Sequence, residues 1–273
     1  MLNKVVMGTG DMLTVVKLGG SSITFKERTF SFDEAAISNI SGALAGFEGR
    51  LFIVHGGGSW GHPVAAAYGL SSFSYSSNSR GASLTRLAML ELSKKVQRSL
   101  VDHGIGVFFF PPQHLESMAG NLEGLYQARA VPLTYGDVIY ESGRGYRVIG
   151  GDEIISRLAA LQRLRRVIFI MRSGGILDSD GNPIQTISLK SGRGTPMDQV
   201  PIMNGNATYT FKQAKDELQT LSPDATGGIT YKLLVAEMLA SQGVEVLFLS
   251  SGDRDNLVKA LNGMKFQGTT VVG

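Results

Sequence analysis

The chain has 273 residues, with 26 lysines and arginines against 23 aspartates and glutamates, and a formal net charge of +3 at pH 7. It contains no cysteine, which excludes a disulfide framework, a thiolate zinc site and a cysteine nucleophile. Hydrophobic residues make up 43% of the chain, which excludes a disordered protein, and no apolar run approaches the roughly 20 residues of a membrane helix. We therefore expect a soluble, cytoplasmic, globular protein without a membrane partner.

The small positive surplus suits an anionic ligand, but it is not gathered into the clustered basic face that is typical of nucleic-acid binding. The densest basic stretch contains Arg163, Arg165 and Arg166. We expect it to end a helix, where cations interact favourably with the helix dipole. No nucleic-acid partner is expected.

Apolar strands alternate with amphipathic helices along most of the chain. Strands are predicted at residues 13–18, 51–54, 105–110, 131–133, 167–171, 244–249 and 269–272. Helices are predicted at residues 32–47, 63–68, 83–103, 154–164, 211–219, 228–242 and 253–261. Residues 138–140 and 146–149 flank Gly143 and Gly145 and predict a hairpin, whereas residues 172–210 are expected to be rich in loops.

Strands separated by helices of 10–15 residues require right-handed crossovers and form a mainly parallel sheet. We therefore predict an α/β fold, a three-layer αβα sandwich with an open, mainly parallel central sheet. We predict a single domain over residues 12–273, with two lobes that meet near residue 165. Residues 1–11 join no periodic element and are expected to form a flexible extension.

Glycine is the compositional outlier, because 35 of 273 residues is about 13%, against a usual share of roughly 7%. Five clusters follow strands or open helices, at residues 19–20, 56–58, 150–151, 174–175 and 227–228. Ligands of open α/β sheets bind at such places, and glycine lets a phosphate approach backbone N–H groups. Each pair on its own is explained equally well by a turn or a helix cap. Five clusters at these positions favour anion binding, although no Walker A or G-x-G-x-x-G motif is present.

Three lysines accompany these clusters. Lys17 ends the first strand just before Gly19, Lys26 lies in the following loop, and Lys232 stands five residues after Gly227. A lysine is a compact positive charge that can follow a phosphoryl group during transfer. A solvated surface position is the alternative for any one lysine, and Lys17 fits that alternative least because its strand is otherwise apolar.

His62 is the other singular residue, because it closes the run from His55 through three glycines, Ser59, Trp60 and Gly61. On a glycine loop or the helix that follows, its imidazole could donate a hydrogen bond to an anionic oxygen. A packed or helix-capping histidine is the alternative.

Five motifs occur in an order that resembles the amino acid kinase superfamily and, within it, the isopentenyl phosphate kinases. They are Lys17-Leu-Gly-Gly-Ser21, His55-Gly-Gly-Gly-Ser-Trp-Gly-His62, Tyr135-Gly-Asp137, Gly150-Gly-Asp-Glu153 and Asp224-Ala-Thr-Gly-Gly-Ile-Thr-Tyr-Lys232. The first two glycine motifs are shared across the superfamily, whereas the closing histidine is typical of isopentenyl phosphate kinases and fosfomycin kinases. The run from Ser83 to Leu92 is also similar to the substrate-side helix of that group.

The resemblance implies an ATP-dependent kinase that converts isopentenyl phosphate to isopentenyl diphosphate in isoprenoid biosynthesis by an alternative mevalonate route. It also implies Mg²⁺ on the nucleotide without a dedicated protein metal site, an acceptor side before residue 165, a nucleotide side after it, and a homodimer. The implied catalytic residues are Lys17, Lys26, His62 and Asp152. The implied acceptor-binding residues are Gly56, Gly57, Gly61, His62, Gly150, Gly151 and, around an alkenyl tail, Leu84, Leu87 and Ala88. The implied nucleotide-binding residues are Lys17, Gly19, Gly20, Ser21, Gly227, Gly228 and Lys232.

The chain departs from the family pattern mainly on the nucleotide side. Where the family usually has Thr-Asp-Val-Asp-Gly, this chain has Arg172-Ser-Gly-Gly-Ile176 after the strand, without either acidic residue. Two alternatives therefore stay open: a phosphonate kinase similar to fosfomycin kinases, and a non-catalytic protein of the same fold that binds nucleotides or oxyanions. For the tail pocket, ordinary core packing of Leu84, Leu87 and Ala88 is the alternative.

Overall fold

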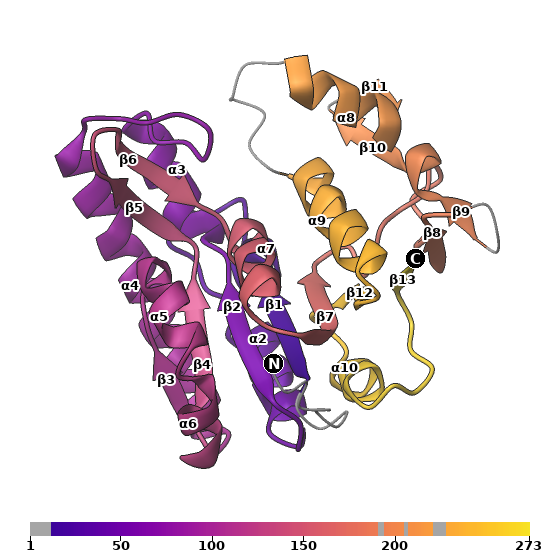
Figure 1. The fold of residues 1–273 in the computed structure, drawn as a ribbon, viewed down its shortest axis with the longest axis horizontal. Helices are drawn as coiled ribbons and strands as arrows, with labels where there is room; N and C mark the ends of the chain where they lie inside the picture. Colours follow the sequence, from indigo (N-terminus) through magenta and orange to yellow (C-terminus); the bar gives the residue numbers. More distant parts are fainter. Residues whose placement is uncertain (1–11, 191–193, 205–206, 221–227) are drawn as a thin grey trace, which may run out of the picture.

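The computed structural model describes residues 12–190, 194–204, 207–220 and 228–273 (Figure 1). The predicted extension over residues 1–11 and the predicted nucleotide-binding residue Gly227 lie outside these ranges.

Within the described residues, nine strands form one sheet in the order β3-β4-β2-β1-β7-β12-β13-β8-β9. Neighbouring strands run parallel except β12 and β13. Their bounds, in chain order, are β1 Leu13–Leu18, β2 Leu51–His55, β3 Val107–Phe109, β4 Val131–Tyr135, β7 Leu164–Met171, β8 Thr186–Ser188, β9 Thr195–Pro196, β12 Glu245–Ser250 and β13 Thr269–Val272. The predicted open, mainly parallel sheet is therefore confirmed.

Two antiparallel hairpins stand apart from this sheet. The predicted one pairs β5 (Asp137–Glu141) with β6 (Gly145–Ile149). The second, β10 (Pro201–Asn204) with β11 (Ala207–Thr210), lies in the stretch where only loops were predicted.

Helices cover both faces of the sheet and complete the predicted three layers (Figure 1). Adjacent residues of β1 illustrate why, since successive strand side chains point to opposite faces. Val16 packs in a core with α2 (Glu34–Leu44), α4 (Ser79–Asp102) and α10 (Arg254–Leu261). Val15 packs in the other core, with α5 (Leu115–Ala119), α6 (Leu122–Gln127), α7 (Gly151–Leu161), α8 (Phe211–Thr220) and α9 (Ile229–Ser241). Helices α5 and α6 were not predicted, because each spans fewer than two turns and shows no sustained period.

The helix that carries His62 starts earlier than predicted. Helix α3 spans Gly58–Ala67 and includes the last glycine of the triple run, with Pro63 inside it. Proline lacks the N–H that would bond the carbonyl four residues earlier, which is that of Ser59. That carbonyl instead accepts a hydrogen bond from the backbone N–H of Phe30, at 3.0 Å. The loop before α2 therefore satisfies the group that the proline leaves free.

The prediction that the basic stretch ends a helix is wrong. Arg165 and Arg166 lie in β7, and Arg166 is buried. Its guanidinium donates to Glu245 at 2.6 Å and to the carbonyls of Ala260 and Leu261 at 2.7 and 2.6 Å. A buried charge needs partners of this kind, so Arg166 has a structural role in β7. The partners are distant in sequence, so the local sequence pattern does not reveal them.

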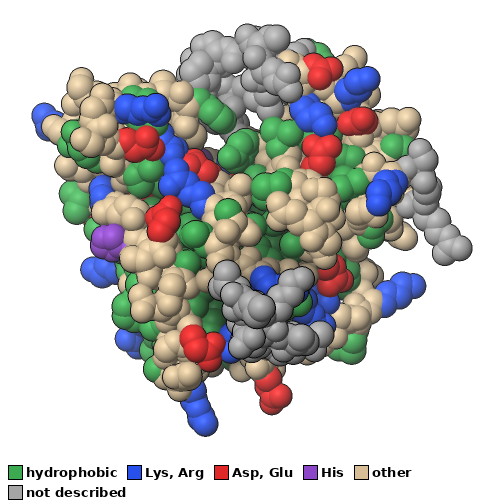
Figure 2. All heavy atoms as spheres, viewed as in Figure 1, with side chains coloured by type: hydrophobic (Ala, Val, Ile, Leu, Met, Phe, Trp, Pro, Cys, Tyr) green, Lys and Arg blue, Asp and Glu red, His purple; other side chains and the backbone are tan. Residues whose placement is uncertain are grey.

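The surface is mixed in charge. On the face shown in Figure 2, basic and acidic side chains are interspersed. Across the described residues, no helix combines the length and apolar character that crossing a bilayer requires.

Two glycine clusters pack backbone to backbone and join β1 to α3. A Cβ atom added to Gly20 would lie 2.1 Å from the backbone nitrogen of Gly58, and one added to Gly56 would lie 2.8 Å from that of Gly20. Gly58 has φ of +48°, a left-handed conformation that favours glycine. Bare glycine is required here because the two loops touch through their main chains.

We predict that Gly20→Ala lowers the free energy of unfolding by about 1–3 kcal/mol, because the added carbon meets backbone rather than a side chain that can move. Gly46→Ala is the matched control, since a Cβ there meets nothing within 4 Å. Urea unfolding of both variants checks the prediction. Equal stability of the two variants would contradict the packing explanation.

Candidate active site at the carboxyl edge of the sheet

The predicted site residues come from segments that follow parallel strands at one edge of the sheet. Short helix α1 (Gly20–Ile23) follows β1, and α3 follows β2. Helix α7 follows the β5–β6 hairpin, whose Asp137 pairs with Ile149 just before Gly150. Since the carboxyl ends of parallel strands share one edge, these segments converge where α/β sheets bind ligands.

Lys17, Asp152 and Lys232 meet at this edge. The ammonium of Lys17 pairs with the carboxylate of Asp152. Lys232 in the first turn of α9 reaches the same carboxylate, with Nζ 3.1 Å from Oδ1 and 3.2 Å from Oδ2. All three side chains are nearly buried, with 7%, 13% and 14% of their surfaces exposed for Lys17, Asp152 and Lys232. Two lysines therefore share one carboxylate, and the group carries one net positive charge when both are protonated.

Phe169 of β7 forms the floor beneath the two ammonium groups. The Nζ atoms of Lys17 and Lys232 lie 5.7 and 5.2 Å from the centre of its ring. The ring stacks on Phe248 of β12 at 4.9 Å, so it cannot tilt freely. An aromatic face attracts cations and offers no hydrogen bond to compete for them.

Burial and the neighbouring charges shift the pKa values of this group. Desolvation, which Asp152 opposes and the charge of Lys232 reinforces, lowers the pKa of Lys17 to about 7. For Asp152, burial raises the pKa, but Lys17 and then Lys232 outweigh it, so the net pKa lies below 3.8. The carboxylate is therefore ionised, and an added anion would raise the pKa of Lys17 again.

His62 and Lys26 lie in the segments that follow β2 and β1. His62 lies on α3 and is exposed, and Lys26 is exposed in the turn after α1. Desolvation lowers the pKa of His62 below 6.5, and the charges of Lys17 and Lys26 lower it further. Helix α3 approaches the loop after Lys17 through the backbones of Gly58 and Gly20. At neutral pH the imidazole is neutral and can donate from one ring nitrogen.

The other histidine of the glycine motif, His55, is a structural residue. It is buried, with Nε2 2.8 Å from the hydroxyl of Ser93 and Nδ1 3.1 Å from the carbonyl oxygen of Gly56. Burial lowers its pKa to about 4.

The glycines of the site differ in what they do. The N–H groups of Gly19 and Gly56 already donate to the carbonyls of Ile170 and Leu18, at 3.1 and 2.9 Å, which argues against both as ligand donors. A Cβ on Gly61 would lie 2.5 Å from the sulfur of Met89, so packing against α4 explains this glycine. A Cβ on Gly57 would lie 3.0 Å from the same sulfur atom.

Gly150 and Gly151 open α7 beside the lysines. A Cβ on Gly151 would lie 3.0 Å from Cε of Lys17, so this glycine makes room for the lysine stem. A Cβ on Gly150 would meet nothing within 4 Å, which leaves its backbone open to a ligand. Gly228 precedes α9, and Ser21 is half-buried in α1. The fifth cluster is structural, since Gly174 has φ of +78° in a turn and a Cβ on Gly175 would lie 2.9 Å from the hydroxyl of Thr269.

The predicted wall for an apolar tail is only partly supported. Leu87 is 56% exposed on the solvent side of α4, whereas Leu84 is half-buried and Ala88 is buried. A separate small apolar cluster joins α3 and α4 to the hairpin: Ala65, Leu70, Ala82 and Val138, with Tyr146 and Val148 packed against them. Leu87, Leu84 and Ala88 therefore differ in burial, and the apolar cluster lies beside the helix of His62.

Ion pairs that the sequence did not predict fix the hairpin to α7. Arg147 of β6 is nearly buried and donates from two guanidinium nitrogens to Glu153, at 2.9 and 2.8 Å. It also donates to Glu141 at 2.9 Å, and Arg157 donates to Glu153 at 2.7 Å. Glu153 follows Asp152 directly, so this network holds the hairpin against the first turn of α7. The sequence pattern of the strand did not indicate that the charged side chain of Arg147 is buried.

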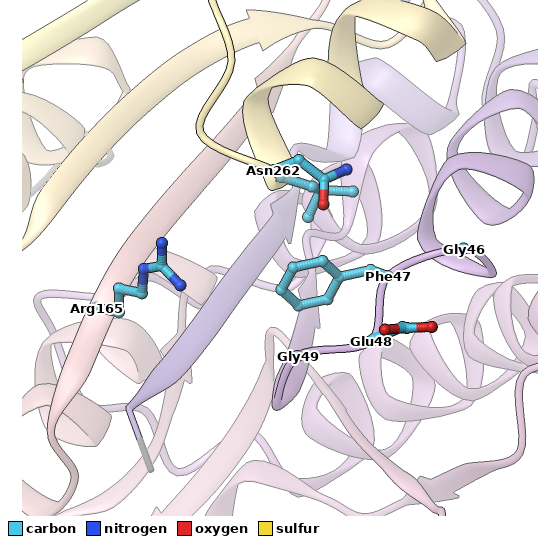
Figure 3. Close-up of a pocket in the computed structure, with 7 residues that line it drawn as sticks. Gly46, Phe47, Glu48, Gly49, Arg165 and Asn262 are labelled. Carbon is cyan, nitrogen blue, oxygen red and sulfur yellow. The ribbon is translucent and has the colours of Figure 1, made fainter. Parts of the chain in front are cut away.

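A shallow pocket of about 280 Å³ lies elsewhere (Figure 3). It is lined by residues before β2, at the start of β7 and at the end of α10, among them Phe47, Glu48, Arg165 and Asn262. These positions belong to the amino ends of the strands, opposite the edge that carries Lys17. The pocket contains none of the predicted site residues.

The family model for the amino acid kinase family matches residues 12–250. The chain belongs to the amino acid kinase family. Among curated relatives, the isopentenyl phosphate kinase of Methanothermobacter thermautotrophicus is 27% identical over 96% of this chain and 99% of its own length. That of Haloferax volcanii is 33% identical over 64% of this chain and 75% of its own.

Solved structures share the fold. A crystal structure of an isopentenyl phosphate kinase substrate complex superposes with a TM-score of 0.69 at 22% identity, covering 96% of this chain and 99% of that one. The N-acetylglutamate synthase of Neisseria gonorrhoeae reaches a TM-score of 0.63 at 13% identity over 97% of this chain and 60% of its own. The fold is therefore shared by proteins with different names.

We predict that Lys17 titrates near pH 7, well below the ordinary 10.5, because burial disfavours its charged form. Asp152→Asn should lower the pKa of Lys17 further, since it removes the one charge that favours protonation. NMR of ¹³C-labelled lysines checks this, with the Lys17 signal assigned by Lys17→Met. Glu237→Gln, which removes the partner of Lys215, is the control and should leave the signal unchanged. A Lys17 pKa above 9 in the unsubstituted protein would contradict the burial argument.

Proposed function

We propose that this chain transfers the γ-phosphoryl group of ATP to the phosphate of isopentenyl phosphate, giving isopentenyl diphosphate and ADP. The observation that carries the proposal is the buried pair of lysines around Asp152, with the helix of His62 packed against the loop after Lys17. Isopentenyl phosphate kinases that align with nearly the whole chain support the choice of acceptor. A role in isoprenoid biosynthesis by an alternative mevalonate route follows from the same proposal.

In this reaction the protein forms no covalent bond to the substrates. An oxygen of the acceptor phosphate forms a bond to the γ-phosphorus while the bond from that phosphorus to the bridging oxygen of ADP breaks. A phosphate oxygen is already ionised at pH 7, so no strong general base is needed. The protein must instead hold two anions in line and neutralise their repulsion.

Each residue of the site has a separate role in binding or orienting these anions. Lys17 lies between the two sides and would contact the transferred phosphoryl group, whereas Lys232 would hold the nucleotide phosphates from α9. Asp152 orients both ammonium groups and remains an anion throughout. His62 would donate to the acceptor phosphate, with Lys26 beside it. A carboxylate acceptor fits less well, because it would give His62 no tetrahedral set of oxygens to bind.

The apolar part of the acceptor would lie near the cluster between α3, α4 and the hairpin. Ala65, Ala82 and Val138 of that cluster are nearly buried, and they offer an apolar surface that suits a short alkenyl chain. The Arg147–Glu153 ion pair would hold the hairpin against the start of α7, where the backbone N–H groups of Gly150 and Gly151 would donate to the acceptor phosphate.

Mg²⁺ is proposed to accompany the nucleotide. Over the residues that the structure describes, no group of three or more carboxylate, imidazole or thiolate side chains could hold a metal ion. The residues present therefore fit a metal bound chiefly by phosphate oxygens, which supplies charge neutralisation when it is bound. Lysines 17 and 232 would hold the remaining negative charge of the phosphates.

We further propose a cytoplasmic homodimer. Leu87, Leu90 and Val101 are exposed apolar side chains on α4, and spacings of 3 and 14 residues place them on nearly one helix face. An apolar face of this kind suits a self-association surface. The molecular mass in solution, measured by light scattering, tests it.

We predict that His62→Ala lowers kcat by roughly 10²–10³, because one donor to the anions is lost while the fold stays intact. His103→Ala is the control: that imidazole caps α4, with Nδ1 2.8 Å from the carbonyl oxygen of Ser99, and is remote from the edge. Steady-state kinetics of both variants decide the matter. Near-normal kcat in His62→Ala would remove the histidine from the mechanism.

A panel of acceptors tests the function itself. ATP consumption is followed with isopentenyl phosphate, dimethylallyl phosphate, fosfomycin and glutamate under identical conditions. The proposal expects the highest kcat/KM with isopentenyl phosphate. A preference for fosfomycin would favour the phosphonate kinase instead. Measurable ATP binding without turnover of any acceptor would favour a non-catalytic protein of this fold.

A further inference from the structure

Arg172 stands at the carboxyl end of β7, where the sequence departs from the family pattern. Its guanidinium is about half exposed and makes three polar contacts, all with the segment between β1 and α2. Nε donates to the carbonyl oxygen of Ser21 at 2.8 Å, and Nη2 donates to that of Thr24 at 3.1 Å and to Oδ2 of Asp33 at 3.1 Å. The two carbonyls belong to the end of α1, where a helix leaves its last carbonyls without partners of its own. Arg172 thus caps the carboxyl end of α1, the helix that follows Lys17.

These contacts enclose the segment that carries Lys26. Thr24 and Asp33 lie on either side of it in sequence, and both bond to the same guanidinium nitrogen. The ring of Phe25, the residue before Lys26, lies 5.1 Å from the guanidinium carbon. Arg172 therefore contacts both residues that precede Lys26.

The opposite side of the same segment is held by α3. The hydroxyl of Ser31 bonds the backbone N–H and carbonyl of Phe25, each at 2.9 Å, and lies 2.9 Å from the hydroxyl of Ser59. The indole N–H of Trp60 donates to the carbonyl of Ser31 at 2.6 Å. The segment therefore lies between the helix of His62 and the strand end that carries Arg172.

We propose that Arg172 is a positioning residue that holds the segment of Lys26 against the helix of His62 and acts on phosphoryl transfer only through Lys26. The role in transfer rests on the proposed function, whereas the holding of the segment does not. The planar guanidinium reaches three acceptors and packs over an aromatic ring, which a single ammonium cannot do. Asp33 serves two purposes here, because its Oδ1 caps α2 through the N–H of Ala36 at 3.0 Å. Its Oδ2 orients the arginine.

The first test needs no turnover. Backbone hydrogen exchange of residues 24–31, followed by mass spectrometry, should become roughly tenfold faster or more in Arg172→Met, as expected from the loss of about two hydrogen bonds. Arg254→Met is the matched control, since this arginine bonds the carbonyl of Gly42 at 3.1 Å and lies outside the site. Unchanged exchange in Arg172→Met, or an equal change in the control, overturns the holding role.

The second test separates positioning from general destabilisation. Arg172→Met should lower kcat with little change in KM for ATP, and Arg172→Lys should not restore it. In a Lys26→Met background, Arg172→Met should have no further effect on kcat, because the group through which it acts is gone. Independent, multiplying effects of the two substitutions overturn the proposal. If the unsubstituted protein turns over no acceptor, the proposed function fails, and the exchange measurement still decides whether Arg172 holds the segment.

Discussion

One carboxylate holds two buried lysines in place, and much of the site depends on this arrangement. Without Asp152, the ammonium groups of Lys17 and Lys232 would repel each other above the ring of Phe169. With it, they lie a short distance apart and carry one net positive charge. Removing one partner of such a buried group costs far more than an exposed ion pair contributes, because the remaining charge lacks compensation. The three residues come from β1, α7 and α9, so this contact joins segments that are far apart in the sequence.

The rest of the molecule supplies the geometry that the charges require. Glycines 20, 56 and 58 let the loops after β1 and β2 touch through their backbones, which brings Lys17 near the helix of His62. Gly151 leaves space for the lysine stem, and the ion pairs of Arg147 fix the hairpin against the turn that carries Asp152. Catalysis by positioning and electrostatics demands this kind of rigidity, since the reacting groups themselves need little activation.

Apolar periodicity predicted the sheet and the hairpin. The resemblance to isopentenyl phosphate kinases, rather than periodicity, implied that Lys17 and Asp152 belong to one site. Sequence reasoning misplaced Arg166, since the partners of that buried arginine lie about 80–95 residues away and leave no local trace. It assigned ligand contacts to Gly19 and Gly56, whose N–H groups are already used within the protein. It also missed Phe169, because an aromatic residue in a buried strand looks the same whether or not cations lie over it.

The central claim is that phosphoryl transfer depends on the carboxylate that holds the two lysines. The most direct measurement follows a single turnover of ATP with isopentenyl phosphate by ³¹P NMR in the unsubstituted protein, in Asp152→Asn and in Asp198→Asn, an exposed control near Lys215. The account predicts the two coupled resonances of a diphosphate product in the first and third, and a rate at least roughly 10² lower in Asp152→Asn. Formation of the diphosphate by Asp152→Asn at the unsubstituted rate would contradict it.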